Sequence, residues 1–422
     1  MRFDLRYGDG SLPLELSGRL TVDTLLPRTV EDQDHIGIKR TIVESLEKPI
    51  DSSPFSKMAS RASSTTIVVN GEEDIDLIPS LLNTVLEYLQ ASLSSPTDIS
   101  VIYPIDPHDS ANQTDILKKL DGPQRDSYQL VLHDSRKNED LCFIGETPTH
   151  CTPVHVNKVV MDADVKIGIG TIRSNVFVGA TGGRMSVLPH SSGVKSISRN
   201  SKLQATHSVG PFVTDSAVCT DLEEASRLAS LDFILNAIPD WKGNLNSIVS
   251  GEPYTAWENG VLVAKKMTET IFQHKADIAI VSAGGSLSDL SLYDAIDALY
   301  AGRAATEHGG VIILVAECAE GPGPDEFVRC VSECGSSEDV SVLAEIGFEI
   351  GMEKARFFWE ILNSRKVIIC SRMRESLIVE KFHCSAVRDP QEGYELARSI
   401  IVSQPRLAII PDGTRILPIM KN

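Results

Sequence analysis

Short runs of β-branched and apolar residues alternate with longer amphipathic segments along most of the chain, and this pattern constrains the fold more than any other feature. Helical spacing of apolar residues is clearest at Leu81, Leu82, Leu86 and Leu89. Strands that are separated by helices need crossover connections, so the pattern predicts a mostly parallel sheet. The strand candidates are residues 65–69, 99–103, 128–132, 165–170, 276–285, 311–318 and 366–371.

The length of 422 residues suits two or three domains at roughly 150 residues each. We predict an α/β protein of two domains with mostly parallel, Rossmann-like sheets and a cleft between the domains. The expected N-terminal domain comprises residues 1–250 and the C-terminal domain residues 251–422, with a last strand that could return to the first domain.

Composition excludes several classes of partner. The 58 acidic and 40 basic side chains give a formal charge of −18, which argues against binding nucleic acid. No apolar run is long enough to span a bilayer, and the first ten residues lack a signal-peptide core. Eight scattered cysteines without a CxxC pair suit reduced thiols. We expect a cytoplasmic protein whose partner is a small molecule, and the oligomeric state stays open.

A glycine-rich stretch at residues 175–196 is the most unusual local feature. Gly179, Gly182 and Gly183, with Thr181, Arg184 and Ser186 beside them, could form a nest of backbone N–H groups for an anion. The spacing matches neither the phosphate-binding loop of nucleotide hydrolases nor the dinucleotide fingerprint, and such stretches are often only turns.

Other candidates lie where predicted strands end. The turn at residues 282–285 follows a strand directly, where α/β sheets bind ligands. His108 and His133 each follow a strand and could serve as a general base, although a single histidine is more often structural. Cys330 and Cys334 lack partners at a metal-ligating spacing and are expected to be buried apolar side chains.

The order of these motifs resembles the nickel-dependent lactate racemase family nearly from end to end. YGDG (7–10) resembles its N-terminal Tyr-Gly, and TDISVIYPIDPHD (97–109) resembles a strand that ends in Ala-Thr-Gly-Thr-His. FVGATGGRMSVLP (177–189) is similar to the signature Phe-x-Gly-x-x-Gly-Gly-x-Lys-x-x-Leu-Pro. Residues 130–172 and the two C-terminal strands with their glycine-rich turns are also similar to the family's segments.

The resemblance implies a particular chemistry. The family uses a nickel pincer nucleotide that accepts hydride from the substrate α-carbon while one histidine takes the hydroxyl proton, and a second histidine serves the opposite face. By position, His108 matches the first base and Asn175 the second. Met185 occupies the place of the lysine that tethers the cofactor, and Ser201 that of the nickel-ligand histidine. By resemblance the cofactor loop comprises Gly179, Thr181, Gly182, Gly183, Arg184, Met185 and Ser186.

Substrate-binding positions by resemblance are Asp74, Tyr293, Asp294 and Asp297. The family has cationic or neutral groups at three of these, so the acidic replacements make lactate itself an unfavourable substrate. Two hypotheses remain open. One is a divergent racemase or epimerase of a 2-hydroxy acid or related hydroxy compound, and the other is a non-catalytic relative that kept the cleft. A weaker third is a divalent-cation site built from Asp74, Asp294, Asp297 and His108.

Overall fold

The computed structural model describes most of the chain. The described residues are 1–28, 35–70, 77–92, 98–105, 118, 120, 124–207, 210–286, 288–401 and 403–421. They form two compact units. The N-terminal unit comprises Thr29–Leu203 and Val209–Met267, and the C-terminal unit comprises Met1–Arg28, Gln204–Ser208 and Thr268–Asn422.

The N-terminal unit is built on a six-stranded sheet in the order β13-β12-β9-β4-β5-β6. All neighbouring strands run parallel except β13, which is antiparallel to β12. The strands are β4 (Ser64–Val69), β5 (Asp98–Pro104), β6 (Gln129–His133), β9 (Val165–Thr171), β12 (Phe233–Pro239) and β13 (Leu245–Gly251). The strands predicted at residues 65–69, 99–103, 128–132 and 165–170 are therefore confirmed.

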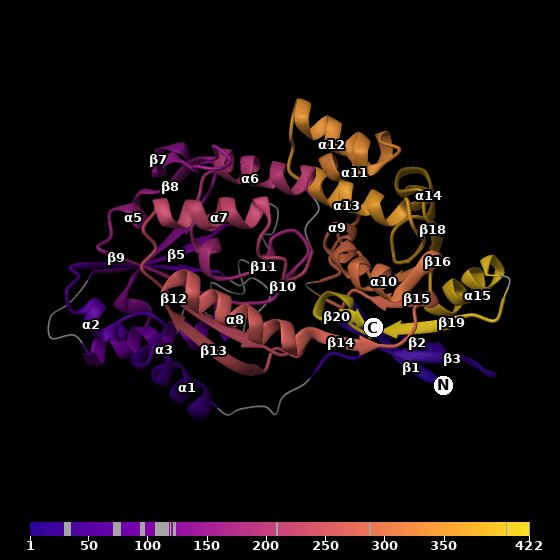
Figure 1. Cartoon of the computed structure of the whole chain (residues 1–422), viewed down its shortest axis with the longest axis horizontal. Coiled ribbons are helices and arrows are strands. Elements are labelled where there is room, and N and C mark those ends of the chain that lie inside the picture. Colours follow the sequence, from indigo (N-terminus) through magenta and orange to yellow (C-terminus); the bar gives the residue numbers. More distant parts are fainter. Residues whose placement is uncertain are drawn as a thin grey trace. The chain divides into compact units, whose positions relative to one another are not determined.

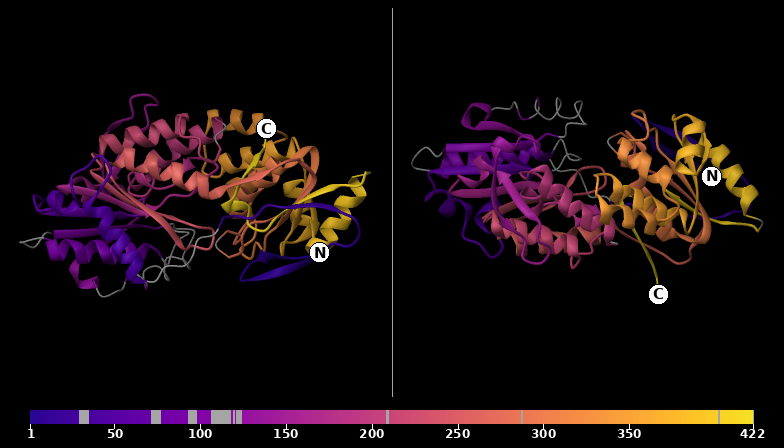
Figure 2. Two further views of the ribbon diagram at one scale, coloured as in Figure 1. Left: turned by 60° about the horizontal axis from the view of Figure 1, so that its bottom comes forward. Right: turned by 90° about the horizontal axis from the view of Figure 1, so that it is seen from above.

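Helices cover both faces of this sheet. Helices α1, α2 and α3 lie on one face and α7 and α8 on the other, and a second view shows the same separation (Figures 1 and 2). Leu81, Leu82, Leu86 and Leu89 of α3 are all buried in the core between the helices and the strands, as their spacing predicted. The helices are α1 (His35–Glu47), α2 (Phe55–Ala59), α3 (Leu77–Ser92), α5 (Lys158–Met161), α6 (Val194–Thr206), α7 (Ala217–Leu228) and α8 (Pro253–Thr268).

The C-terminal unit contains a second six-stranded sheet, in the order β18-β17-β16-β15-β19-β3, and every neighbouring pair is parallel. One face is packed against the hairpin of β1 and β2 and against α15, whose apolar residues share a core with the strands. The strands are β3 (Thr21–Thr24), β15 (Ala276–Ser282), β16 (Thr306–Val315), β17 (Lys366–Cys370), β18 (Ser385–Val387) and β19 (Arg406–Ile410), and the hairpin is β1 (Arg2–Tyr7) and β2 (Gly10–Glu15).

The remaining elements of the C-terminal unit are mainly helices. Residues 292–305 form α9 (Leu292–Ala295), the 3-10 turn η4 (Ile296–Ala298) and α10 (Leu299–Ala305). The others are α11 (Asp325–Glu333), α12 (Ser337–Ile346), α13 (Met352–Leu362), α14 (Glu375–Phe382) and α15 (Pro390–Ile400). In the part of the chain that is described, no helix has both the length and the apolar character required to cross a bilayer.

The units differ from the domain boundaries expected at residue 250. Residues 1–28 lie in the C-terminal unit, because β3 pairs with β19. The last strand, β20 (Leu417–Met420), pairs with β14 (Glu269–Phe272) of the C-terminal unit and does not return to the N-terminal sheet. Pairing between strands that are hundreds of residues apart leaves no local signal in the sequence. The boundaries of the two units could therefore not be predicted from the sequence.

Candidate functional site

The glycine-rich loop lies across the carboxyl ends of the N-terminal sheet, where α/β proteins commonly bind ligands. It contains β11 (Gly179–Ala180), paired with β10 (Ser174–Asn175), and the 3-10 helix η3 (Gly183–Ser186). Two side chains from the sheet fix it. Asn70, which follows β4, donates from Nδ2 to Ser186 Oγ at 2.9 Å, and Asn236 Oδ1 on β12 accepts from the Gly183 N–H at 3.0 Å. The indole of Trp257 on α8 donates to the Thr181 carbonyl at 2.9 Å.

The glycines of this region are required by packing. A Cβ on Gly170 would lie 1.5 Å from Asn70 Oδ1, and one on Gly168 would lie 2.2 Å from Ser186 Oγ. Gly179 has a φ of 74° and would meet the Val213 carbonyl oxygen at 2.1 Å. Close approach of backbone segments and a positive φ each select glycine. The glycines of this motif are therefore explained without any ligand.

Most N–H groups of the loop that could cradle an anion already have partners in the protein. Thr181 donates to the Arg173 carbonyl at 3.0 Å, Met185 to the Gly182 carbonyl at 3.2 Å, and Gly183 to Asn236 as above. Arg184 is only 5 % exposed, and its guanidinium carbon lies 3.7 Å from the centre of the Trp257 ring. Arg184, which was expected to lie beside an anion at the loop, is thus stacked on the indole of Trp257 in α8.

Three positions that were matched by resemblance to chemical residues of the family are described in the structure. Asn175 Oδ1 accepts from the N–H groups of Phe177 and Val178 at 2.8 and 3.0 Å, which organises the turn between β10 and β11. Met185 is half-buried in η3, and Ser201 is half-buried on α6. The amide of Asn175 cannot serve as a base near neutral pH.

The histidines of this unit have mainly structural surroundings. His133 is 2 % exposed, its Nε2 lies 3.0 Å from the Ser192 carbonyl and its Nδ1 lies 3.1 Å from Asn157 Nδ2, so both nitrogens have partners. His190 follows η3, and burial lowers its pKa from 6.5 to about 4. Its Nδ1 is buried and has no hydrogen-bond partner among the described residues. His207, which belongs to the C-terminal unit, is exposed. Of His133 and His190, only His190 has a buried ring nitrogen without a hydrogen-bond partner among the described residues.

The early Tyr-Gly motif lies at the carboxyl end of the C-terminal sheet. Gly8 donates to Asp289 Oδ2 at 2.8 Å and its carbonyl accepts from Ser286 at 2.9 Å. The β1–β2 turn therefore contacts the glycine-rich turn after β15, where Gly285 would place a Cβ 2.8 Å from the Gly8 carbonyl oxygen. Burial and nearby thiol and carboxylate groups raise the pKa of Tyr7 to about 12. Residues that are 281 positions apart in the sequence, Gly8 and Asp289, thus lie together at this end of the sheet.

The segment Tyr293–Asp297 carries the substrate positions expected in the C-terminal unit. Asp294 Oδ2 accepts from the backbone and hydroxyl of Ser291 at 3.1 and 2.6 Å, forming a capping box at the start of α9. Asp297 pairs with Lys354 of α13, with 3.1 Å between Oδ1 and Nζ. The Lys354 ammonium also donates to the Tyr293 carbonyl at 2.8 Å and lies 4.3 Å from the centre of its ring. Both carboxylates therefore have partners, Asp294 in Ser291 and Asp297 in Lys354.

The buried carboxyl group of Glu353 also contacts the Tyr293–Asp297 segment. Glu353 is 6 % exposed and accepts from the Tyr293 hydroxyl and from the Gly351 N–H, both at 2.9 Å. Burial raises the pKa of Glu353 above its ordinary value, and burial together with the Glu353 charge raises that of Tyr293 well above its own. Tyr293 thus acts as a neutral hydrogen-bond donor near neutral pH.

Comparison with known proteins identifies the family. The family model described as the lactate racemase N-terminal domain matches residues 7–210, and that of the lactate racemase C-terminal domain matches residues 271–417. The chain belongs to the lactate racemase family. It is 25 % identical to a lactate racemase of Thermoanaerobacterium thermosaccharolyticum, over 98 % of both chains. It is 23 % identical to a lactate racemase of Lactiplantibacillus plantarum, over 98 % of this chain and 99 % of the other.

Solved structures confirm the family's fold for this chain. The lactate racemase apoprotein from T. thermosaccharolyticum superposes with a TM-score of 0.84 at 23 % identity and covers 99 % of this chain and 100 % of that one. A protein from Thermotoga maritima gives a TM-score of 0.65 at 13 % identity, over 93 % of this chain and 100 % of the other. The resemblance read from the motifs and the predicted α/β fold are both confirmed.

The structure describes some of the lactate racemase positions named from the sequence and not others. His108 and Asp74 lie outside the described residues, so the structure does not place them. The loop residues Gly179–Ser186 lie together at one sheet edge, and Tyr293, Asp294 and Asp297 lie together beside Lys354. Among the described residues no group of three or more histidine, cysteine or carboxylate side chains could hold a metal ion.

Sequence reasoning missed the residues that hold these segments. Asn70 follows a predicted strand directly, a position that could have indicated a role at the sheet edge. Asn236 lies on the strand β12, which had not been predicted, and Lys354 lies 57 residues beyond Asp297 on an amphipathic helix. No local pattern connects these residues with their partners.

Proposed function

We propose that this protein is a racemase or epimerase of a small 2-hydroxy acid. The observation that carries the proposal is the likeness to two lactate racemases over nearly the whole chain, with both family domains present in order. An isomerase of this kind must hold the substrate carboxylate, move the hydroxyl proton and give access to both faces of the α-carbon.

Lys354 is the group that we assign to the substrate carboxylate. The sequence suggested that Asp294 and Asp297 would repel an acid. In the structure Asp294 is engaged in a capping box and Asp297 in an ion pair with Lys354, so their charges are largely offset. An ammonium group can donate three hydrogen bonds, and a carboxylate arriving near Tyr293 would share the Lys354 ammonium with Asp297.

His108 is the proposed base for the hydroxyl proton, on the strength of its match to the family's motif after β5. An imidazole is the side chain best suited to accept and return a proton around neutral pH. Asn175 is not a second base, because its side-chain oxygen accepts two backbone N–H groups and an amide does not titrate. The proposal therefore assigns one histidine base.

The nickel pincer nucleotide implied by the family does not fit the residues at its expected attachment points. A methionine thioether at position 185 cannot form the covalent bond that a lysine amine forms, and the hydroxyl of Ser201 is a much poorer nickel ligand than an imidazole. We therefore derive no step through this group. Hydride acceptance in this protein requires either a non-covalently held acceptor or another acceptor.

A non-catalytic, ligand-binding relative is the second candidate function. The observation that favours it is that the surviving glycines are explained by packing, since Gly168, Gly170 and Gly179 would each place a Cβ within 2.2 Å of another atom. A scaffold can keep such glycines after the chemical residues are lost.

The test is to incubate the full chain with single enantiomers of lactate and of larger 2-hydroxy acids and to follow inversion by chiral chromatography. The proposal predicts inversion of at least one acid, and Lys354→Met is expected to raise KM by about tenfold, the loss expected for one charge-assisted hydrogen bond, with a smaller effect on kcat. Lys381→Met, an exposed lysine of α14, is the matched control. Specific binding without inversion of any acid would contradict the proposal and support the non-catalytic relative.

A further inference from the structure

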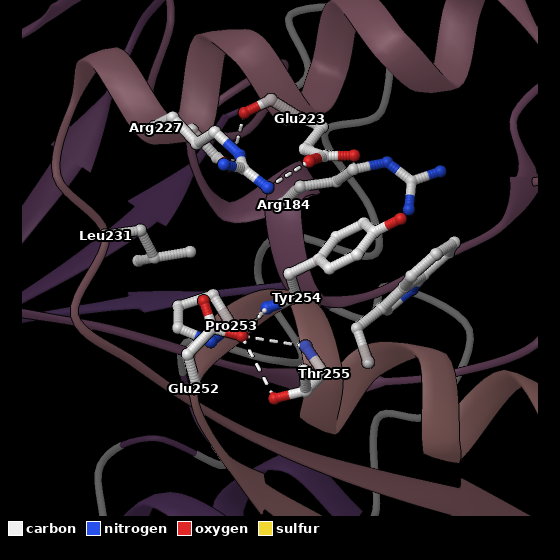
Figure 3. Close-up of a pocket in the computed structure, with 10 residues that line it drawn as sticks. Arg184, Glu223, Arg227, Leu231, Glu252, Pro253, Tyr254 and Thr255 are labelled. Atoms are coloured by element: carbon white, nitrogen blue, oxygen red, sulfur yellow. Dashed lines mark hydrogen bonds and ion pairs between the residues drawn. The ribbon is translucent and has the colours of Figure 1, made fainter. Parts of the chain in front are cut away.

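A pocket of about 330 Å³ lies wholly within the N-terminal unit, between α7 and the first turns of α8 (Figure 3). Glu223, Ser226 and Arg227 of α7 line one side, and Tyr254 and Trp257 of α8 line the other. Arg184 reaches this pocket from the glycine-rich loop. We call it the α7–α8 pocket. None of its lining residues except Arg184 belongs to the positions discussed for the racemase site.

Three of the four charged groups around the α7–α8 pocket already have partners. Arg227 forms an ion pair with Glu223, one turn earlier on α7. Glu252 Oε2 accepts from the N–H groups of Tyr254 and Thr255 at 3.0 and 2.8 Å, so it caps the N-terminus of α8. These contacts satisfy Arg227, Glu223 and Glu252 without any ligand.

Arg184 differs from these three because it is buried and makes no ion pair with a described residue. It is 5 % exposed, stacks on Trp257, and donates from Nη2 to the Val178 carbonyl at a long 3.4 Å. It also interacts with the Cys219 thiol and with the charge of Glu223, but its Nε is buried and has no hydrogen-bond partner among the described residues. A carboxylate that binds a guanidinium in the fork geometry would supply that missing acceptor.

The rest of the pocket wall defines the body of the ligand. Leu231, Pro253, Tyr254 and Trp257 present apolar and aromatic surface, and Figure 3 shows the Tyr254 ring beneath the arginine and glutamate side chains. A volume near 330 Å³ is at the lower end of ligand pockets, which hold roughly 300–1,000 Å³. The pocket therefore suits a small molecule with a flat apolar body.

We propose that the α7–α8 pocket binds a small carboxylic acid with an apolar body, its carboxylate on Arg184 and its body against Tyr254 and Trp257. This site is separate from the proposed racemase site, whose carboxylate group is Lys354. A 2-hydroxy acid and a 2-amino acid share the required carboxylate, and the two are distinguished in the experiment by direct comparison.

The experiment is calorimetric titration of the full chain with phenylacetate and with the neutral phenylacetamide, which has nearly the same shape. We expect the acid to bind at least about tenfold more tightly than the amide, because only the acid forms a charge-assisted bond with the guanidinium. Phenyllactate and phenylalanine then show whether a hydroxyl or an ammonium at the second carbon is preferred.

Three variants locate the binding. Arg184→Met removes the guanidinium, and Leu231→Trp fills the pocket while leaving every charge in place, so both should weaken phenylacetate binding by at least about tenfold. Arg61→Met, an exposed arginine of the same unit, should bind as the parent does. Equal binding of acid and amide would overturn the proposal, as would undiminished binding by Leu231→Trp.

Discussion

The glycine-rich loop of the N-terminal unit and the Tyr293–Asp297 segment of the C-terminal unit both resemble ligand-binding motifs, but different interactions hold them in place. The loop is fixed by close backbone packing and by hydrogen bonds with two neutral side chains, those of Asn70 and Asn236. The Tyr293–Asp297 segment is fixed by charges, through the ion pair of Asp297 with Lys354 and the contact of Tyr293 with Glu353.

This difference predicts how the two regions respond to substitution. Each loop glycine is enclosed by neighbouring atoms, which exclude a larger side chain. In the Tyr293–Asp297 segment Lys354 offsets the charge of Asp297, so substitutions there are expected to change the charge balance more than the packing. The glycine motif by itself is therefore evidence for packing and not for chemistry.

The largest expected effect is that of Gly170→Ala, which tests whether steric exclusion holds the loop. The new Cβ would lie 1.5 Å from Asn70 Oδ1 and 2.6 Å from the Asn70 carbonyl oxygen. We expect a loss of about 3 kcal/mol in the free energy of unfolding, measured by urea denaturation. Gly347→Ala is the control, because a Cβ there meets nothing within 4 Å. A Gly170→Ala protein as stable as this control would contradict the packing account.

The next effect concerns His190, which adjoins the loop. Its folded pKa of about 4 lies below the ordinary 6.5, so as the pH falls through this interval the unfolded state binds a proton and the folded state does not. We expect stability to fall by on the order of 2–3 kcal/mol between pH 6.5 and 4 from this group. His190→Gln should remove that part of the pH dependence. An unchanged stability profile would show that the imidazole is accessible to protons in the folded state.

Lys354→Met tests the charged segment. The side chain of Asp297 is 27 % exposed and would lose its cation, so we expect a loss of about 1–2 kcal/mol in the free energy of unfolding. Asp297→Asn combined with Lys354→Met should be more stable than Lys354→Met alone, because the carboxylate that lost the lysine is then neutral. Asp297→Asn alone completes the double-mutant cycle, and effects of the two single changes that add up to that of the double change would mean that the pair is not energetically coupled.

The smallest effect is expected from Glu353→Gln. The pKa of Glu353 is raised by burial, so below its ordinary pKa it is protonated in both states and has no effect. As the pH rises above that value the unfolded state ionises first, which favours unfolding. As the pH rises above the ordinary pKa of a glutamic acid, the parent should therefore lose stability while Glu353→Gln does not. We expect this difference in the free energy of unfolding to be smaller than the loss caused by Lys354→Met. A difference independent of pH would contradict the assigned burial.

Much of the fold could be predicted because its signals are local. The strands β4, β5, β9 and β15 are runs of β-branched residues bounded by polar or glycine residues, and each was located within a few residues. The antiparallel edge strand β13 and the placement of residues 1–28 were not predicted. Both depend on partners far away in the sequence, Leu245–Gly251 on β12 and Thr21–Thr24 on β19.

The candidate site could be predicted only in outline. The sequence pointed to the loop and to the acidic residues Asp294 and Asp297 as candidate positions, but not to the partners that offset their charges. Arg184 was expected to lie beside an anion, and in the structure it stacks on Trp257, 73 residues later. Ion pairs and stacking depend on side-chain directions that only the three-dimensional arrangement determines.

The most direct test of the account is the intact mass of the protein purified from cells that make the pincer cofactor. The central claim is that the lactate racemase scaffold is kept while covalent attachment of the cofactor at Met185 is lost. The account predicts the mass of the unmodified chain, with Met185→Lys as the variant that restores an attachable amine. A covalent addition to the unchanged chain would contradict it.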